Sequence, residues 1–208
     1  MYIAIDIGGT RTRLAASTRL DTPEIEDRKE FVTSDSFDEN YQNIANYIDS
    51  KKPIEGIGIS IPGDLDKNKS TVIKNAQHTP CYLGAPLKKL LAEKYQCPVQ
   101  MDNDGAAAAL GEAVYGKGKG INFAYITWGT GVGGALVKYI NEKPIVTQLD
   151  WDKYLSTWEE TCGGENLERR FGKTAEQLIG SEWGEIFELF QKELLEFVDK
   201  LHPQRVIF

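Results

Sequence analysis

The residues best suited to chemistry lie near the start of the chain, in the run Asp6–Thr12 (DIGGTRT). This run stands between two apolar segments, Tyr2–Ile5 and Leu14–Ala16, and that arrangement predicts a β-hairpin with glycines at its tip. Because glycine has no Cβ, the N–H groups of Gly8 and Gly9 can approach an anion closely. The predicted tip is therefore a candidate phosphate-binding turn.

Polar side chains at the same tip suit a bound phosphate. Thr10 supplies a hydroxyl donor and Arg11 a permanent positive charge, while Asp6 supplies a carboxylate that could hold hydrated Mg²⁺. A Gly-Gly-Thr run taken alone is more often an ordinary tight turn, so the assignment needs support from elsewhere in the chain.

A second glycine-rich run, Trp128–Gly134 (WGTGVGG), provides that support. It lies between the strand-like segments Ile121–Thr127 and Ala135–Tyr139. Its glycines match the spacing G-x-G-x-x-G, but a dinucleotide-binding fold needs a helix after the glycines and here a strand follows. The run is better interpreted as a second hairpin whose tip can wrap a phosphate tail.

A candidate base lies between the two hairpins. Val99–Met101 predicts a short strand and Ala106–Tyr115 a helix, which places Asp104 near the positive N-terminal end of that helix. A carboxylate there could accept a proton from a sugar hydroxyl as the oxygen attacks phosphorus. Aspartate at this position often only caps the helix. Beside two phosphate-type hairpins, the role of base is favoured.

These runs resemble the motifs of the ROK family of sugar kinases and transcription repressors, within the actin, Hsp70 and hexokinase superfamily. Asp6–Thr12 is similar to the first phosphate motif of the family, with Arg11 in place of the usual lysine. Ile59–Asp66 resembles its P-G-x-x-D segment, and Asn103–Glu112 resembles N-D-A-N-A-A-A-L-G-E. Thr127–Gly134 is similar to the second phosphate motif. Four motifs in this order, spread along nearly the whole chain, are far more specific than any one of them.

The resemblance implies an α/β protein with the two-lobed actin-like ATPase (ribonuclease H-like) sugar kinase fold. The predicted lobes are residues 1–115 and 116–208, joined through the glycine-rich turn 116–120. The segment Leu201–Phe208 resembles the strand that precedes the adenosine-binding G-G-G turn of the family. We therefore expect an incomplete second lobe without the usual adenine wall, from a naturally short chain or a fragment. ATP and polyphosphate both stay open as donors.

The resemblance also implies roles for individual residues. Asp104 matches the catalytic base, and Asp6 matches the carboxylate near Mg²⁺, which it would hold through water. Predicted sugar-binding residues are Asn103, Gly63, Asn75 and Gln148. Predicted nucleotide phosphate-binding residues are Gly8, Gly9, Thr10, Arg11, Thr130 and Gly131.

Two departures from the family pattern affect the sugar site and the metal content. Where the family has E-x-G-H, Gln148 stands in place of the glutamate and Trp151 in place of the histidine. Glutamine can still bond to a hydroxyl but carries no charge, and tryptophan could stack on a sugar or fill the pocket. The cysteines have no C-x-C or C-x-x-C spacing, so we expect no zinc site and reduced, packed thiols.

Composition agrees with a cytoplasmic protein. The chain has 208 residues, 41% of them hydrophobic, which is enough for one large domain or two small ones. A formal net charge of −7 argues against nucleic-acid binding. We expect neither a membrane helix nor a signal peptide, because no apolar run is long enough for the first and no pattern indicates the second. The predicted helix Ser181–Leu201 has an apolar stripe that is typical of a core or a subunit interface, so a homodimer is expected.

Three functions follow from these observations. The favoured one is a glucokinase-like kinase that transfers the γ-phosphoryl group of ATP to a hydroxyl of a hexose or amino-hexose, with Asp104 as general base. The second is a sugar- or nucleotide-binding protein without turnover, which Gln148 and Trp151 motivate. The third is an incomplete fragment without a ligand.

Overall fold

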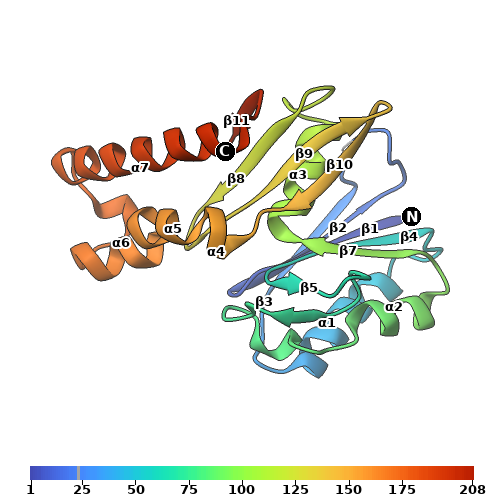
Figure 1. Cartoon of the computed structure of the whole chain (residues 1–208). Helices are drawn as coiled ribbons and strands as arrows, with labels where there is room; N and C mark the ends of the chain where they lie inside the picture. Colours follow the sequence, from blue (N-terminus) through green and yellow to red (C-terminus); the bar gives the residue numbers. More distant parts are fainter. Residues whose placement is uncertain (23) are drawn as a thin grey trace. The chain divides into compact units, whose positions relative to one another are not determined.

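The computed structural model describes residues 1–22 and 24–208. The chain divides into two compact units, Met1–Ala107 and Ala108–Phe208. Helix α3 (Asp104–Val114) contributes residues to both units. The two lobes expected from the sequence, residues 1–115 and 116–208, remain a prediction. Figure 1 labels the elements of both units.

A five-stranded mixed sheet organises the first unit. Its order is β3-β2-β1-β4-β7, with β1 to β3 antiparallel and with β4 and β7 parallel to β1. The strands are β1 (Tyr2–Ile7), β2 (Arg11–Ser17), β3 (Asp27–Val32), β4 (Gly56–Ile61) and β7 (Val99–Asn103). The helices are α1 (Phe37–Asp49), α2 (Leu87–Tyr95) and the 3₁₀ turn η1 (Pro80–Tyr82). The predicted hairpin of β1 and β2 and the short strand predicted over Val99–Met101 are confirmed.

Alternation along β1 separates the core face of this sheet from its polar face. Ile3, Ile5 and Ile7 are buried, while Ala4 and Asp6 between them are exposed. The buried side chains of α1, which include Ile44 and Ile48, belong to the same hydrophobic core. The carboxylate of Asp6 therefore lies on the face of the sheet opposite to its buried isoleucines.

A small hairpin that the sequence did not predict follows β4. It pairs β5 (Asp64–Leu65) with β6 (Val72–Lys74). Its turn is closed by Asp66, whose Oδ1 accepts the N–H groups of Ser70 (2.5 Å) and Thr71 (3.0 Å). Strands of two and three residues are too short to show a hydrophobic period, which explains why they were missed.

The second unit contains a four-stranded sheet of order β10-β9-β8-β11, in which β11 runs parallel to β8. The strands are β8 (Phe123–Trp128), β9 (Val132–Ile140), β10 (Lys143–Gln148) and β11 (Arg205–Ile207). The helices are α4 (Trp151–Tyr154), α5 (Ser156–Cys162), α6 (Gly164–Phe171), the 3₁₀ turn η2 (Ala175–Gln177) and α7 (Gly180–Leu201). Figure 1 shows α4 to α6 at the end of the sheet where the glycine turn joins β8 to β9. Neither β10 nor α4 was predicted.

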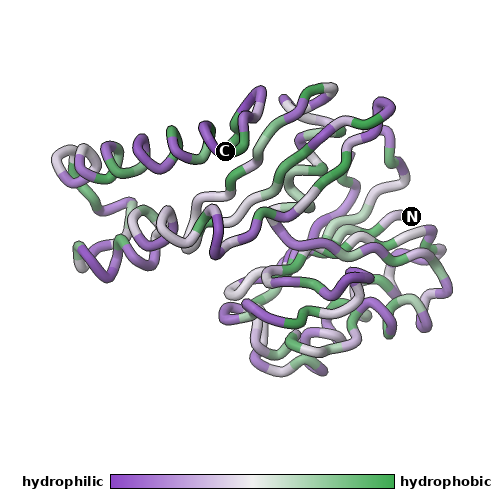
Figure 2. The backbone as a smooth tube through the Cα atoms, in the orientation of Figure 1, coloured by the Kyte–Doolittle hydropathy of each residue, from purple (hydrophilic) through white to green (hydrophobic). Residues whose placement is uncertain are grey.

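Helix α7 supplies part of the second hydrophobic core. Ile186 and Phe197 on α7 are buried in that core together with Trp158 of α5. Hydrophobic and hydrophilic residues alternate along α7 in Figure 2. The predicted apolar stripe is only partly buried, because the side chains of Phe187 and Leu195 are 54% and 61% exposed. None of the helices in the described parts of the chain has the length and apolar character that a membrane span requires.

Candidate functional site

The first glycine turn closes the hairpin of β1 and β2, as predicted. Ile7 pairs with Thr12, and the N–H of Gly8 donates to the carbonyl oxygen of Arg11 at 3.0 Å. A Cβ on Gly9 would lie 2.8 Å from both the Cβ and the carbonyl oxygen of His78. Gly9 is therefore required by the close approach of the segment after β6, a contact that the sequence did not reveal.

The cation predicted to bind phosphate is already paired. Nη1 of Arg11 donates to Oε1 of Glu30 on β3 at 2.7 Å. The other carboxylate oxygen of Glu30 accepts Nε of Arg13 at 2.9 Å, so two arginines share one glutamate. Glu30 thus offsets part of the positive charge beside the first turn.

Asp6, the predicted magnesium residue, lies at the end of β1 with a half-exposed side chain. Its Oδ1 accepts the hydroxyl of Ser60 at 3.0 Å, and its Oδ2 is 3.6 Å from Nη1 of Arg13. Mg²⁺ prefers oxygen ligands and usually keeps several waters while it binds one or two carboxylates. The exposed carboxylate of Asp6 fits that preference. Among residues 1–22 and 24–208, no group of three or more His, Cys, Asp or Glu side chains could hold a metal ion.

Helix α3 begins at Asp104, two residues earlier than predicted, and Asn103 caps it. Oδ1 of Asn103 accepts the N–H groups of Gly105 (3.0 Å) and Ala106 (3.4 Å). The carboxylate of Asp104 accepts a short-range bond from the N–H of Gly105 at 2.8 Å. Capping, the alternative role considered for Asp104, is thus performed mainly by the residue before it.

The environment of Asp104 favours the protonated form of its carboxyl group. Burial is the largest cause and raises the pKa of Asp104, and the negative charge of Asp6 raises it further. Hydrogen bonds from Gly105 and Asn103 act in the opposite direction. A carboxylate whose pKa lies above the usual range of aspartate is a better proton acceptor near neutral pH.

Three of the four predicted sugar-binding residues lie together in the first unit. Nδ2 of Asn103 donates to the carbonyl oxygen of Gly63 at 3.0 Å. Gly63 has a φ of +101°, and a Cβ there would lie 3.2 Å from the carbonyl oxygen of Asn75. Nδ2 of Asn75 in turn donates to Asp64 at 2.9 Å. These contacts connect Asn75, Gly63 and Asn103 to the start of α3, where Asp104 lies.

The second glycine turn joins β8 to β9, also as predicted, and it is fastened to the helices behind it. The carbonyl oxygens of Gly129 and Thr130 accept the N–H groups of Gly164 (2.9 Å) and Glu165 (3.0 Å) at the start of α6. A Cβ on Gly164 would lie 2.8 Å from the Gly129 oxygen, so this contact requires glycine. The turn therefore has a fixed backbone that the sequence pattern did not reveal.

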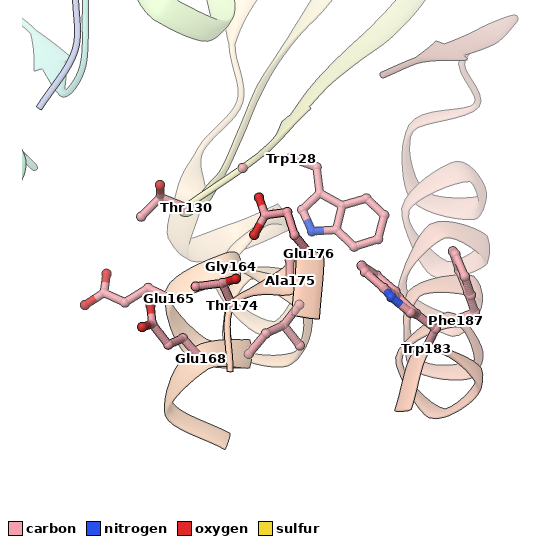
Figure 3. Close-up of a pocket in the computed structure, with 12 residues that line it drawn as sticks. Trp128, Thr130, Gly164, Glu165, Glu168, Thr174, Ala175, Glu176, Trp183 and Phe187 are labelled. Atoms are coloured by element: carbon pink, nitrogen blue, oxygen red, sulfur yellow. The ribbon is translucent and has the colours of Figure 1, made fainter. Parts of the chain in front are cut away.

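A pocket of about 680 Å³ lies beside this second turn. Figure 3 shows Trp128 on β8 facing Trp183 on α7, with Glu165 and Glu168 extending from α6. The twelve lining residues, all in the second unit, are Trp128, Gly129, Thr130, Gly164, Glu165, Leu167, Glu168, Thr174, Ala175, Glu176, Trp183 and Phe187. The lining thus combines aromatic rings with carboxylates and contains no lysine or arginine. The sequence had assigned the aromatic residues of α7 to a core or an interface.

Gln148 and Trp151, which stand where the family has glutamate and histidine, lie around the start of α4. Gln148 ends β10 opposite Ala135 of β9, and Trp151 is the first residue of α4, with 36% of its surface exposed. Gln148, Thr130 and Gly131 belong to the second unit, and the other predicted site residues belong to the first.

Comparison with known sequences gives a consistent result. The sequence model of one family, described as the ROK family, matches residues 2–147. A glucokinase of Halalkalibacterium halodurans is 33% identical over 145 residues, which cover 65% of this chain and 43% of that enzyme. The chain spans about half the length, or less, of this glucokinase and of a second curated relative that it matches.

Comparison with solved structures supports the fold. A ROK family glucokinase from Streptomyces griseus, in complex with glucose and AMPPNP, is 25% identical with a TM-score of 0.63, over 81% of this chain and 59% of that one. An inorganic polyphosphate/ATP-glucomannokinase from Arthrobacter sp. strain KM has a TM-score of 0.72 at 23% identity, over 99% of this chain and 81% of that one. The α/β fold of the actin-like ATPase type, expected from the sequence, is confirmed.

Proposed function

The chain belongs to the ROK family, and on that premise we propose that it is a sugar kinase, which transfers the γ-phosphoryl group of ATP to a hydroxyl of a hexose or amino-hexose. The observation that carries this proposal is the carboxyl group of Asp104. It lies at the first residue of α3 with a raised pKa, directly after Asn103, whose Nδ2 donates to the carbonyl oxygen of Gly63.

The chemistry needs one proton acceptor on the sugar side. Asp104 takes the proton of the attacking hydroxyl, whose oxygen forms a bond to the γ-phosphorus. The bond between that phosphorus and the oxygen that bridges to the β-phosphate breaks, and ADP leaves with the electron pair. Orientation of the hydroxyl and stabilisation of the developing charge supply most of the rate enhancement.

Backbone N–H groups of Gly9 and Thr10 in the first glycine turn, and of Thr130 and Gly131 in the second, would bind the donor phosphates. Gly8 would shape the first turn, because its own N–H already donates to the carbonyl oxygen of Arg11. Asp6 would hold magnesium through water, and the ion would neutralise charge on the phosphates when bound. Arg11 can turn to a phosphate only by leaving Glu30, so we assign it a smaller part than the glycine turns.

The pocket beside the second turn supports a nucleotide, not polyphosphate, as donor. Its aromatic side chains, Trp128, Trp183 and Phe187, suit the flat face of a base, and its glutamates can accept hydrogen bonds from ribose hydroxyls. The same glutamates repel a long polyanion. The Streptomyces griseus glucokinase was solved with an ATP analogue, and the Arthrobacter enzyme is named for both donors.

A coupled assay for ADP with a panel of hexoses and amino-hexoses tests the proposal. We expect ADP formation to depend on one or more of these sugars and to fall at least about a hundredfold in kcat in Asp104→Asn, because general-base catalysis is typically worth that much. Polyphosphate in place of ATP, with detection of the sugar phosphate, should give little product.

Two results would contradict parts of this proposal. Sugar-dependent turnover that survives in Asp104→Asn would remove Asp104 as the base. Calorimetric binding of a hexose or of ATP without any phosphorylated product would favour the second candidate, a binding protein without turnover, which the uncharged Gln148 favours.

A further inference from the structure

A row of polar side chains crosses the first sheet, one from each strand. The strand registers place Glu30 of β3 opposite Arg13 of β2, Arg13 opposite Asp6 of β1, and Asp6 opposite Ser60 of β4. Ser60 in turn lies opposite Asp102 of β7. Because directly opposite residues share a face of the sheet, these five side chains form one line across its polar face.

Arg13 occupies the centre of the charged half of this row and bonds on both sides. Its Nε is 2.9 Å from Oε2 of Glu30, and its Nη1 is 3.6 Å from Oδ2 of Asp6. The other oxygen of Asp6 accepts the hydroxyl of Ser60. Two different nitrogens of one guanidinium therefore serve two carboxylates, with the shorter contact to Glu30.

We propose that Arg13 is a built-in counter-ion of Asp6, which balances the carboxylate in the free protein and withdraws toward Glu30 when a divalent cation binds there. This inference rests on the proposed function, because it takes Asp6 as the residue that holds magnesium. When the cation binds, the contact of 2.9 Å between Arg13 and Glu30 persists, and the longer contact between Arg13 and Asp6 breaks.

The unequal contacts explain how Arg13 can release Asp6 without leaving the sheet. Nε keeps its bond to Glu30 while Nη1 gives up a contact that is already long for a charge-assisted bond. Ser60 keeps the carboxylate oriented through its other oxygen. The protein thus exchanges one positive charge for another at Asp6 with no change in the strands.

The proposal makes Arg13 a competitor of the metal ion. A unit positive charge a few ångströms from a divalent cation in a solvated site opposes binding by an amount that corresponds to about a three- to tenfold change in affinity. Removal of the guanidinium should therefore strengthen metal binding. If Arg13 only supported the fold, its replacement would weaken metal binding or leave it unchanged.

Binding of Mn²⁺ in place of Mg²⁺, followed by electron paramagnetic resonance without nucleotide or sugar, measures this directly on the full chain. We expect Arg13→Gln to bind Mn²⁺ about three- to tenfold more tightly than the unmodified protein, and Arg13→Lys to bind like it. Glu30→Gln should bind more weakly, because Arg11 and Arg13 both lose the carboxylate that they share. Asp6→Asn should lose this binding.

Arg19→Gln is the matched control, because Arg19 is another exposed arginine of the same unit and pairs with Asp21 at 2.7 Å. Its Mn²⁺ affinity should not change. Circular dichroism checks that every variant is folded.

Two outcomes overturn the inference. One is an unchanged or weaker Mn²⁺ affinity in Arg13→Gln while Asp6→Asn abolishes binding. The other is Mn²⁺ binding that does not depend on Asp6 at all. Either outcome leaves the proposed kinase reaction to its own test, the dependence of sugar-linked ADP formation on Asp104, so the two failures are distinguishable.

Discussion

At the scale of single residues, Asp104 combines a chemical advantage with a structural penalty. Its pKa is raised mainly by burial, so the ionised carboxyl is less stable in the folded chain than in the unfolded chain. The contribution of this group to the free energy of unfolding therefore falls as the pH rises from the ordinary pKa of aspartate through the raised one. The loss is complete once the pH lies well above the raised pKa.

The replacement Asp104→Asn should consequently raise Tm at neutral pH while it removes activity. A neutral amide of nearly the same shape avoids the unfavourable burial of charge. The gain should shrink as the pH is lowered toward the ordinary pKa of aspartate, and thermal unfolding followed by circular dichroism between pH 5 and pH 8 measures it.

Asp66→Asn is the control of opposite sign for this comparison. Hydrogen bonds from Ser70, with a smaller contribution from Thr71, lower the pKa of Asp66, so its ionised form stabilises the fold. Its replacement should lower Tm at neutral pH. A drop in Tm for both variants would show that burial does not dominate at Asp104.

At the scale of elements, the first glycine turn is held by a contact from outside its own hairpin. Gly9→Ala would place a methyl group 2.8 Å from backbone and side-chain atoms of His78. We expect a loss of about 1–3 kcal/mol in the free energy of unfolding, as for other over-packed sites, and a higher KM for ATP. Urea titration followed by circular dichroism measures the first effect.

Gly58→Ala is the matched control, because Gly58 lies in β4 of the same sheet and a Cβ there meets no atom within 4 Å. Its unfolding free energy should stay within about 1 kcal/mol of the unmodified protein. Equal losses in the two variants would mean that the His78 contact is not the cause.

The elements also show what the sequence could and could not predict. Both glycine hairpins and the helix that begins near Asp104 were predicted, because glycine, apolar runs and alanine act through local backbone preferences. Strand β10 was missed, since Pro144 is unusual in a strand and is tolerated here at the edge of the sheet.

Contacts between distant segments were beyond the sequence altogether. The pairing of Arg11 with Glu30 and the approach of His78 to Gly9 join residues 19 and 69 positions apart, and no local pattern encodes them. The cap at Asn103 is different, because asparagine before an alanine-rich helix is a recognisable signal. It was assigned to the sugar site, and its Nδ2 donates to Gly63 while Oδ1 caps the helix.

At the scale of the whole molecule, each unit has its own hydrophobic core, with no residue in common. Leu91 of the first core is fully buried. Leu91→Ala should lower the free energy of unfolding of that unit by about 2–5 kcal/mol, through lost burial and the cavity that remains. Urea titration followed by circular dichroism measures the shift.

All four tryptophans of the chain, Trp128, Trp151, Trp158 and Trp183, belong to the second unit, so their fluorescence reports on that unit alone. Leu91→Ala should shift the midpoint of the fluorescence transition only slightly. It should shift the early part of the circular dichroism transition more, because the destabilised first unit contributes to that part. Identical shifts of both signals would show that the two cores unfold as one.

The homodimer expected from the stripe on α7 stays a proposal, for which exposed Phe187 and Leu195 provide the apolar surface.

The attachment of the second glycine turn to the start of α6 has a kinetic consequence. Since the carbonyl groups of Gly129 and Thr130 are already engaged by Gly164 and Glu165, the loop has lost its conformational freedom before any anion arrives. Binding of the proposed donor at this turn would then require no ordering of the segment. The association rate of the donor should accordingly be high, as for a rigid receptor. Its dependence on viscosity should not exceed that of diffusion, as it would if a flap had to close.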